Sequence, residues 1–200
     1  MLVRHAEVEA KYQRVFGGRI DMDLSPRGHQ QAVALTQWLK RQPLDAVYAS
    51  PMKRVQQTLA PSASNGVPKP IIMPDLREVD FGDWTGLGWE AVQENFGVAA
   101  FQWLELLERG AIPNAETGAS YRARIEPCLR NILQQSSRQN VAVFCHGGVI
   151  RMLLAILLEL PLPKMASFEI DYASVTRVEM FPHKTEVQLL NFTPWREAGL

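Results

Sequence analysis

Four ionisable side chains occur in short motifs that could together bind and attack an oxyanion. They are Arg4 and His5 near the start of the chain, Arg54, and His146. Arginine suits phosphate because its planar guanidinium donates hydrogen bonds to two oxygens at once, and a neutral imidazole can act as a covalent nucleophile. Gly147 follows the second histidine and, having no Cβ, lets the backbone approach a ligand closely. The residue types therefore indicate chemistry on a doubly charged tetrahedral oxyanion such as phosphate.

Each motif stands where a predicted strand ends or a predicted helix begins. Residues 1–3 form a short apolar, β-prone run that leads directly into the first arginine-histidine pair. Residues 44–49 form a second buried strand, and Ser50-Pro51 after it is a helix start signal that places the next arginine in an opening turn. Residues 141–145 form a third buried strand, which ends at the second histidine. All four ionisable residues should thus be held by regular structure.

The rest of the chain alternates between helical and extended patterns. The first of the other predicted helices begins at Pro26 and is stopped by Pro43, and the remaining ones cover residues 89–96, 99–108, 121–135 and 149–159. The other predicted strands cover residues 71–73, 174–181 and 186–192. Ser25 is the expected N-cap of the first of these helices. Pro127 is expected to kink or restart the helix over 121–135, and His146-Gly147-Gly148 is expected to form a tight turn. The last two strands should pair with each other.

This order of elements predicts an α/β fold with three layers, in which a mostly parallel sheet is flanked by helices. Parallel strands need helical crossovers, which cover both faces of the sheet. The length favours a single domain over residues 1–200. Residues of about 80–118 are rich in Trp and punctuated by Gly, and they are expected to form a small helical cap insertion. Trp84, Trp89 and Trp103 could line the substrate site there, or could simply be core.

Open α/β sheets bind ligands beyond the carboxyl ends of their strands. We therefore expect one edge of the sheet to carry all four side chains, those of Arg4, His5, Arg54 and His146. Two of the motifs should also lie beside helix amino termini, which favour an anion. Each motif alone has a plain structural explanation, such as a solvated helix arginine or a histidine in a turn, but the combination favours a phosphate pocket. A metal site is disfavoured, because the arginines would repel a cation and no further ligand has a useful spacing.

The overall composition excludes several classes of partner. The 21 basic and 21 acidic residues cancel and form no long run, so neither nucleic acid nor an anionic membrane surface is expected as a partner. The longest apolar run, Met152–Leu158, is shorter than the roughly 20 residues that span a bilayer. The amino terminus has no leader pattern, and Cys128 and Cys145 suit a reducing compartment. A cytoplasmic location follows, and the oligomeric state stays open.

Four blocks of the sequence resemble the histidine phosphatase superfamily, the phosphoglycerate mutase-like proteins. In the order of that family, they are LVRHAE, ASPMKRVQQTL, LREVDFGDWTG and FCHGGVIR. The resemblance implies an α/β fold in which His5 is the nucleophile and Glu78 is the proton donor. It also implies that Arg4, Arg54 and a protonated His146 bind the phosphoryl group, with neither a metal ion nor another cofactor.

The blocks depart from the family pattern at a few positions. Ala6 stands in place of a glycine, Val8 where many members have Ser or Thr, and Lys11 where many have Asn. Any substrate contact made by the family residues at the last two positions is therefore unsupported. Asp80 and Asp83 are alternative candidates for the proton donor.

Within the superfamily, the chain is similar to the α-ribazole phosphatases of the cobalamin pathway. The likeness lies in LREVDFGDW, AIPNAETGASYRARIE and MASFEIDYASVTRVEM. It implies a metal-independent phosphomonoester hydrolase that acts on a small-molecule phosphate ester, here α-ribazole 5′-phosphate. A phosphoglycerate mutase and a broad-specificity sugar phosphatase are alternatives because they could carry the same blocks. An inactive phosphate-ester-binding protein is a further alternative, against which the intact set of five site residues argues.

Overall fold

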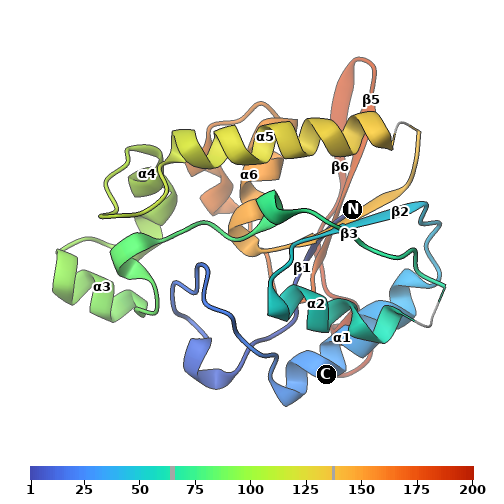
Figure 1. Ribbon diagram of the computed structural model, residues 1–200, viewed down its shortest axis with the longest axis horizontal. Helices are drawn as coiled ribbons and strands as arrows, with labels where there is room; N and C mark the ends of the chain where they lie inside the picture. The colour runs from blue at the N-terminus through green and yellow to red at the C-terminus, as the bar shows by residue number, and fades with distance from the viewer. Residues whose placement is uncertain (64–65, 137) are drawn as a thin grey trace.

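The computed structural model describes residues 1–63, 66–136 and 138–200. Its centre is a six-stranded sheet with the strand order β3-β2-β4-β1-β5-β6 (Figure 1). The strands are β1 (Leu2–Arg4), β2 (Ala46–Ala49), β3 (Ile71–Ile72), β4 (Val141–Cys145), β5 (Val175–Phe181) and β6 (Lys184–Phe192). The first four are parallel, whereas β5 is antiparallel to β1 and pairs with β6 as an antiparallel hairpin. The prediction of a mostly parallel sheet with a closing pair of strands is confirmed.

The register of the parallel strands brings the predicted motifs to one edge. Arg4 of β1 pairs with Cys145 of β4, so that His5 and His146 leave the sheet side by side. β2 lies on the other side of β4 and ends at Ala49. The candidate site therefore lies at the carboxyl ends of β1, β4 and β2.

Helices cover both faces of the sheet and complete the three predicted layers. Figure 1 shows α5 (Gly118–Gln135) and α6 (Gly147–Leu157) above the sheet, and α1 (Pro26–Leu39) and α2 (Lys53–Leu59) below it. Each face has its own buried hydrophobic cluster. The short α7 (Pro194–Glu197) contributes Trp195 to the cluster between α1 and the sheet. No helix in the described part of the chain combines the length and apolar character needed to cross a bilayer.

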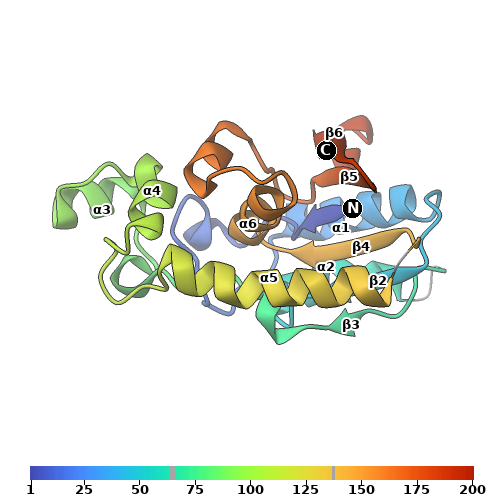
Figure 2. The same cartoon turned by 90° about the horizontal axis from the view of Figure 1, so that it is seen from above.

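The segment predicted as a cap contains two short helices, α3 (Trp89–Phe96) and α4 (Trp103–Glu108). Both lie beyond the end of the sheet, at the left of Figures 1 and 2. Trp84 and Leu104 are buried in the hydrophobic cluster on the α5 side of the sheet, which anchors this segment to the body of the fold. Trp84 is thus a core residue.

Four helices differ from their predicted bounds. α4 begins at Trp103, after a 3-10 turn over Ala100–Gln102, rather than at residue 99. The helix that carries Arg54 begins at Lys53 rather than at the Ser50-Pro51 signal, and its N-cap Met52 makes no side-chain capping bond. The hydroxyl of Ser50 lies within hydrogen-bonding distance of a histidine ring instead, as described below, and also accepts a bond from the backbone N–H of Met52. Arg54 nevertheless stays in the opening turn, as predicted.

The other two differences concern α6 and α5. Gly147 and Gly148 form the first turn of α6 rather than a separate tight turn, with His146 as the N-cap. α5 begins at Gly118, earlier than predicted, and runs through Pro127 without restarting. Proline removes one backbone hydrogen bond from a helix. Pro127 lies on the exposed face of α5, where water can hydrate the carbonyl left without that bond.

Candidate active site

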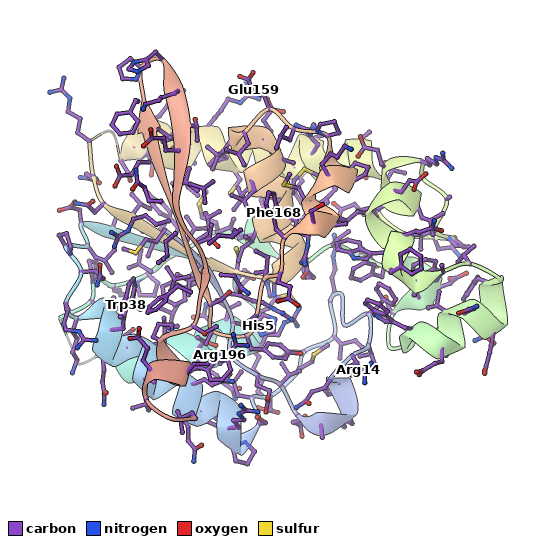
Figure 3. All side chains as sticks on the ribbon, turned by 180° about the vertical axis from the view of Figure 1, so that it is seen from behind. His5, Arg14, Trp38, Glu159, Phe168 and Arg196 are labelled. Carbon is purple, nitrogen blue, oxygen red and sulfur yellow. The ribbon has the colours of Figure 1, made fainter. Side chains whose placement is uncertain are left out.

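A cavity of about 240 Å³ opens at the carboxyl ends of the parallel strands. Its walls include Arg4, His5, Arg14, Arg54, Glu78, Phe81, Trp89, Trp103, Gly147, Gly148, Arg151 and Tyr172. Figure 3 shows His5 between the end of the sheet and the loop that carries Arg14. Nearly all of the predicted site residues thus meet at one cavity, together with several that the sequence did not single out.

The ring of His5 is buried and held in one tautomer. Nδ1 lies 2.8 Å from the carbonyl oxygen of Ala6 and must donate to it, because a carbonyl can only accept. The lone pair of Nε2 accepts a hydrogen bond from Nε of Arg54 at 3.2 Å. Burial first, and then the charges of Arg54 and Arg4, hold the pKa of His5 well below its ordinary value. The imidazole is therefore neutral at neutral pH, which is the form of a nucleophile.

Arg54 links the two histidines. Its Nε also lies 3.2 Å from Nδ1 of His146, while Nη1 and Nη2 donate to the carbonyls of Ile20 and Gly18 at 2.8 and 2.9 Å. These bonds fix the guanidinium and leave one N–H on each terminal nitrogen for a ligand. Burial lowers the pKa of Arg54 to about 10, so the group keeps its charge at neutral pH.

His146 is buried, and its polar contacts are with Arg54 and Ser50. Since Nδ1 accepts from Arg54, the proton of the neutral ring is on Nε2, which lies 2.9 Å from Oγ of Ser50. Burial, and then Arg54 and His5, hold the pKa of His146 well below its ordinary value. In this geometry the ring is therefore neutral at neutral pH, because a buried imidazolium beside a guanidinium is unfavourable. Protonation of His146 against a bound phosphoryl group stays a prediction.

Arg4 and Gly147 lie together at the amino terminus of α6. Nη1 of Arg4 donates to the carbonyl of Ile170 at 2.6 Å, and its guanidinium lies 4.1 Å from the centre of the Tyr172 ring. Its Nε is buried with no hydrogen-bond partner in the described part of the chain. A Cβ on Gly147 would lie 3.5 Å from that Nε, so the glycine keeps the space directly beside the guanidinium clear of a side chain.

Glu78 lies on the other side of the same helix terminus. Oε2 accepts a hydrogen bond from the backbone N–H of Gly148 at 3.1 Å, and Oε1 accepts one from the N–H of Val79 at 3.0 Å. Asp80 instead accepts from the backbone of Gly82, and Asp83 accepts from Asn114. Of the three candidate acids, the described residues place only Glu78 in the cavity wall.

Several polar residues of the site, Arg14 among them, were not predicted as such from the sequence. Ser50 orients His146, Arg151 lies one turn beyond Gly147 on α6, and Tyr172 packs on Arg4 with its ring 5.6 Å from that of His5. The motif FCHGGVIR contains Arg151 and could have drawn attention to it, because a residue four positions after Gly147 shares its helix face. No sequence signal marks Tyr172, which belongs to the loop before β5.

The arrangement combines a neutral nucleophile, fixed cations and a carboxylate around a small cavity. Arg4, Arg54 and Arg151 have no carboxylate within ion-pair distance in the described residues, so their charge is available to an anion. No group of three or more His, Cys, Asp or Glu side chains in residues 1–63, 66–136 and 138–200 could hold a metal ion. The chemistry that fits is transfer of a phosphoryl group.

Proteins of known sequence resemble this chain along nearly its whole length. Phosphoserine phosphatase 1 of Hydrogenobacter thermophilus is 33% identical over 193 residues, covering 96% of this chain and 92% of that protein. The adenosylcobalamin/alpha-ribazole phosphatase of Escherichia coli is 25% identical and covers 95% and 94%, respectively. The chain is therefore similar to phosphatases with different named substrates.

Solved structures and the family profile agree with the fold. The alpha-ribazole phosphatase of Shigella flexneri superposes with a TM-score of 0.81 at 25% identity, covering 95% of this chain and 94% of that one. A mycobacterial glucosyl-3-phosphoglycerate phosphatase shares the fold with a TM-score of 0.85 at 23% identity, covering 96% and 97%. Residues 1–193 match the profile of the histidine phosphatase superfamily (branch 1), and this chain belongs to that family.

Proposed function

We propose that this chain hydrolyses phosphate monoesters through a phosphohistidine formed on His5, without a metal ion. The observation that carries the proposal is the geometry of His5 and Arg54: a neutral imidazole of fixed tautomer presents Nε2 to a buried guanidinium at 3.2 Å. A phosphoryl group attacked by that nitrogen would have its equatorial oxygens beside Arg54, Arg4 and the first turn of α6. Positioned charges of this kind are what phosphoryl transfer chiefly needs.

In the first step, Nε2 of His5 attacks phosphorus, the N–P bond forms and the ester P–O bond breaks. The departing oxygen takes a proton from the carboxyl group of Glu78. In the second step, the Glu78 carboxylate accepts a proton from water, the water oxygen bonds to phosphorus and the N–P bond breaks. Both groups are then restored. A bound phosphoryl dianion would also favour protonation of His146, which would bring a further positive charge to the site.

We also propose that residues 80–118 act as a cap that shields the bound ester from water, within a single domain over residues 1–200. Phe81, Trp89 and Trp103 from this segment line the cavity. The ring of Trp103 packs on that of Phe81 at 5.4 Å, whereas Trp89 is 51% exposed and stands at the mouth. An apolar wall beside the phosphoryl group strengthens electrostatic interactions inside the site.

The names of the relatives support hydrolysis over the isomerisation of phosphoglycerates, because they are phosphatases. These names leave two candidate substrates, which differ in the alcohol that departs. α-Ribazole 5′-phosphate is a nucleotide without a carboxylate, and phosphoserine is an amino acid that carries one. A substrate panel should contain both esters, simple sugar phosphates and phosphoglycerates. Measuring released phosphate and isomerised product separates a hydrolase from a mutase and ranks the substrates.

Buried free Cys128 and Cys145 are consistent with action in the cytoplasm.

The experiment that tests the mechanism is the trapping of the phosphoenzyme. A rapid alkaline quench during turnover of a labelled ester should yield one acid-labile, alkali-stable phosphoryl group per chain. His5→Ala should abolish both the label and turnover, whereas His29→Ala, a change at an exposed histidine, should preserve both. Full turnover by His5→Ala would refute the proposed nucleophile.

A further inference from the structure

Arg151 is a cation in the cavity wall to which the reaction proposed above assigns no task. Nη2 donates to the carbonyl of Phe168 at 3.0 Å, and Nη1 makes a long bond of 3.3 Å to the carbonyl of Gly147. Nε is buried and has no hydrogen-bond partner within residues 1–63, 66–136 and 138–200. Burial, followed by the charge of Arg4, lowers the pKa of Arg151 to about 10, so the group is charged at neutral pH. A fixed, partly unpaired guanidinium suits an anion.

Arg151 and Arg4 flank the same glycine. A Cβ placed on Gly147 would lie 3.3 Å from Nη1 of Arg151 and 3.5 Å from Nε of Arg4. Each arginine has a buried Nε without a partner in the described residues. Two like charges side by side are unfavourable unless an anion joins them. An anion bound beside Gly147 would therefore meet two guanidiniums.

The position of Glu78 tells which end of the substrate reaches Arg151. Glu78 accepts from the N–H of Gly148, the residue after Gly147, and in the proposed reaction it protonates the departing oxygen. Arg151 follows Gly147 by about one turn of α6, whereas Arg54 belongs to the histidine pair on which phosphorus would be held. An anion at Arg151 would be a substituent of the alcohol, a short distance from the ester oxygen.

We infer that the substrate is a phosphate ester whose alcohol carries a carboxylate near the ester oxygen, and that Arg151 binds this carboxylate. Two features support a carboxylate over a neutral alcohol. The planar fork of arginine matches a carboxylate with two parallel bonds. The cavity wall also holds four arginines, Arg4, Arg14, Arg54 and Arg151, against the single carboxylate of Glu78, which is more positive charge than a phosphoryl dianion neutralises. This inference rests on the proposed function.

The first test compares two esters that differ only by the carboxylate. O-Phosphoserine and O-phosphoethanolamine share the phosphate and the amine. 3-Phosphoglycerate and glycerol 3-phosphate form a second pair, in which a hydroxymethyl group replaces the carboxylate. The carboxylated member should have a kcat/KM higher by roughly 10- to 100-fold, the factor expected for a charge-assisted hydrogen-bonded pair. Equal values in the unaltered protein, for both pairs, would overturn the inference without any variant.

The second test assigns the preference to Arg151. Arg151→Met keeps an unbranched side chain that matches the aliphatic part of arginine but removes the charged guanidinium, so the ratio of kcat/KM between phosphoserine and phosphoethanolamine should fall close to one. Arg151→Lys, which keeps a cation without the fork, should restore part of the ratio. Arg130→Met makes the same chemical change on the exposed face of α5 and should leave the ratio unaltered. An equal loss for both esters in Arg151→Met, with the ratio kept, would show that Arg151 serves the phosphoryl group instead.

The failure of this inference is distinguishable from a failure of the proposed function. p-Nitrophenyl phosphate has no carboxylate and an easily displaced leaving group, so its hydrolysis reports only the phosphoryl site and His5. Turnover of this ester without any preference between the paired substrates overturns the carboxylate site alone. Absence of a trapped phosphoenzyme with every ester overturns the proposed function itself.

Discussion

Oε2 of Glu78 lies 3.1 Å from the backbone nitrogen of Gly148 and accepts its hydrogen. This bond ties the candidate acid to the first turn of α6, the same turn that begins directly after His146. A Cβ on Gly148 would lie 2.5 Å from Oε1 of Glu78, so the glycine is what lets the carboxylate come so near. A hydrogen bond thus joins the candidate proton donor to the amino terminus of α6.

Glu78→Gln should slow the phosphorylation of His5 in a manner that depends on the leaving group. Glutamine keeps the size of the side chain but has no acidic proton. For a substrate with a basic alkoxide leaving group, such as a sugar phosphate or phosphoserine, the step should slow by roughly 10²- to 10⁴-fold, the usual contribution of general acid catalysis. For p-nitrophenyl phosphate, which needs no proton, the burst of p-nitrophenolate should slow far less. Rapid-quench and stopped-flow measurements give the two rates.

Asp80→Asn and Asp83→Asn are the matched controls, since both carboxylates bond outside the cavity wall. Neither should show dependence on the leaving group. If Glu78→Gln slows both esters equally, the residue acts in another way, and a leaving-group effect in either aspartate variant would then identify the acid.

Turnover should survive a large excess of chelator. The positive charge that faces the phosphoryl group comes from Arg4 and Arg54, and no cluster of metal-binding side chains occurs among the described residues. Steady-state rates with EDTA and with 1,10-phenanthroline, alongside metal analysis of the dialysed protein, provide the measurement. A loss of activity that returns on addition of zinc or magnesium would contradict the proposed mechanism.

The free energy of unfolding should fall as the pH drops below about 6.5, the ordinary pKa of histidine. His5 and His146 both have a lowered pKa in the folded state, chiefly because they are buried. Below that pH the unfolded chain therefore binds more protons than the folded one, which favours unfolding. Each histidine contributes a slope of up to about 1.4 kcal/mol per pH unit, until the pH reaches its folded-state pKa.

His146→Gln isolates one part of this slope, because the other titrating groups are common to both proteins. Urea unfolding between pH 5 and 7.5 should give a smaller slope for this variant than for the unaltered chain. The slope should be unchanged in His29→Gln, because the His29 side chain is exposed on α1. Identical slopes for His146→Gln and the unaltered chain would show that His146 is not held neutral by the fold.

Gly28→Ala should destabilise the protein, although alanine is the better helix former. Gly28 is buried in α1, and a Cβ there would lie 2.0 Å from the backbone carbonyl oxygen of Glu7. That carbonyl also accepts from the N–H of Ser25 and cannot easily move away. Overpacking of this kind costs about 1–3 kcal/mol, which urea denaturation resolves. Gln30→Ala, at an exposed position of the same helix, should change stability by less than about 0.5 kcal/mol. An increase in stability for Gly28→Ala would refute the close contact.

The parts of the site that follow from strand order could be predicted from the sequence. His5 and His146 come directly after two buried strands, and parallel pairing of those strands places the histidines side by side. Arg54 follows β2, which pairs with β4, closely enough to reach them. The prediction of Glu78 as a site residue depended on the family resemblance, because Glu78 lies in an irregular segment whose path no periodicity fixes.

What could not be predicted depends on contacts between segments far apart in the chain. Ser50 reads as a helix cap by local rules, yet its hydroxyl meets His146, a residue 96 positions away. Tyr172 reaches Arg4 because β5 joins the sheet antiparallel to β1, which no spacing in the sequence reveals. The lowered pKa of His146 could not be predicted for a related reason: burial beside Arg54 becomes visible only once both are placed.

The bond from Nδ1 of His5 to the carbonyl of Ala6 also decides the regiochemistry of the modified enzyme. An imidazole can be phosphorylated at either ring nitrogen, and free histidine gives a mixture of the pros and tele isomers. Here the pros nitrogen, Nδ1, has its proton committed to the backbone, and only the tele nitrogen, Nε2, has a lone pair toward Arg54. The phosphoenzyme should therefore be a single tele isomer, and its ³¹P resonance should appear without a pros partner.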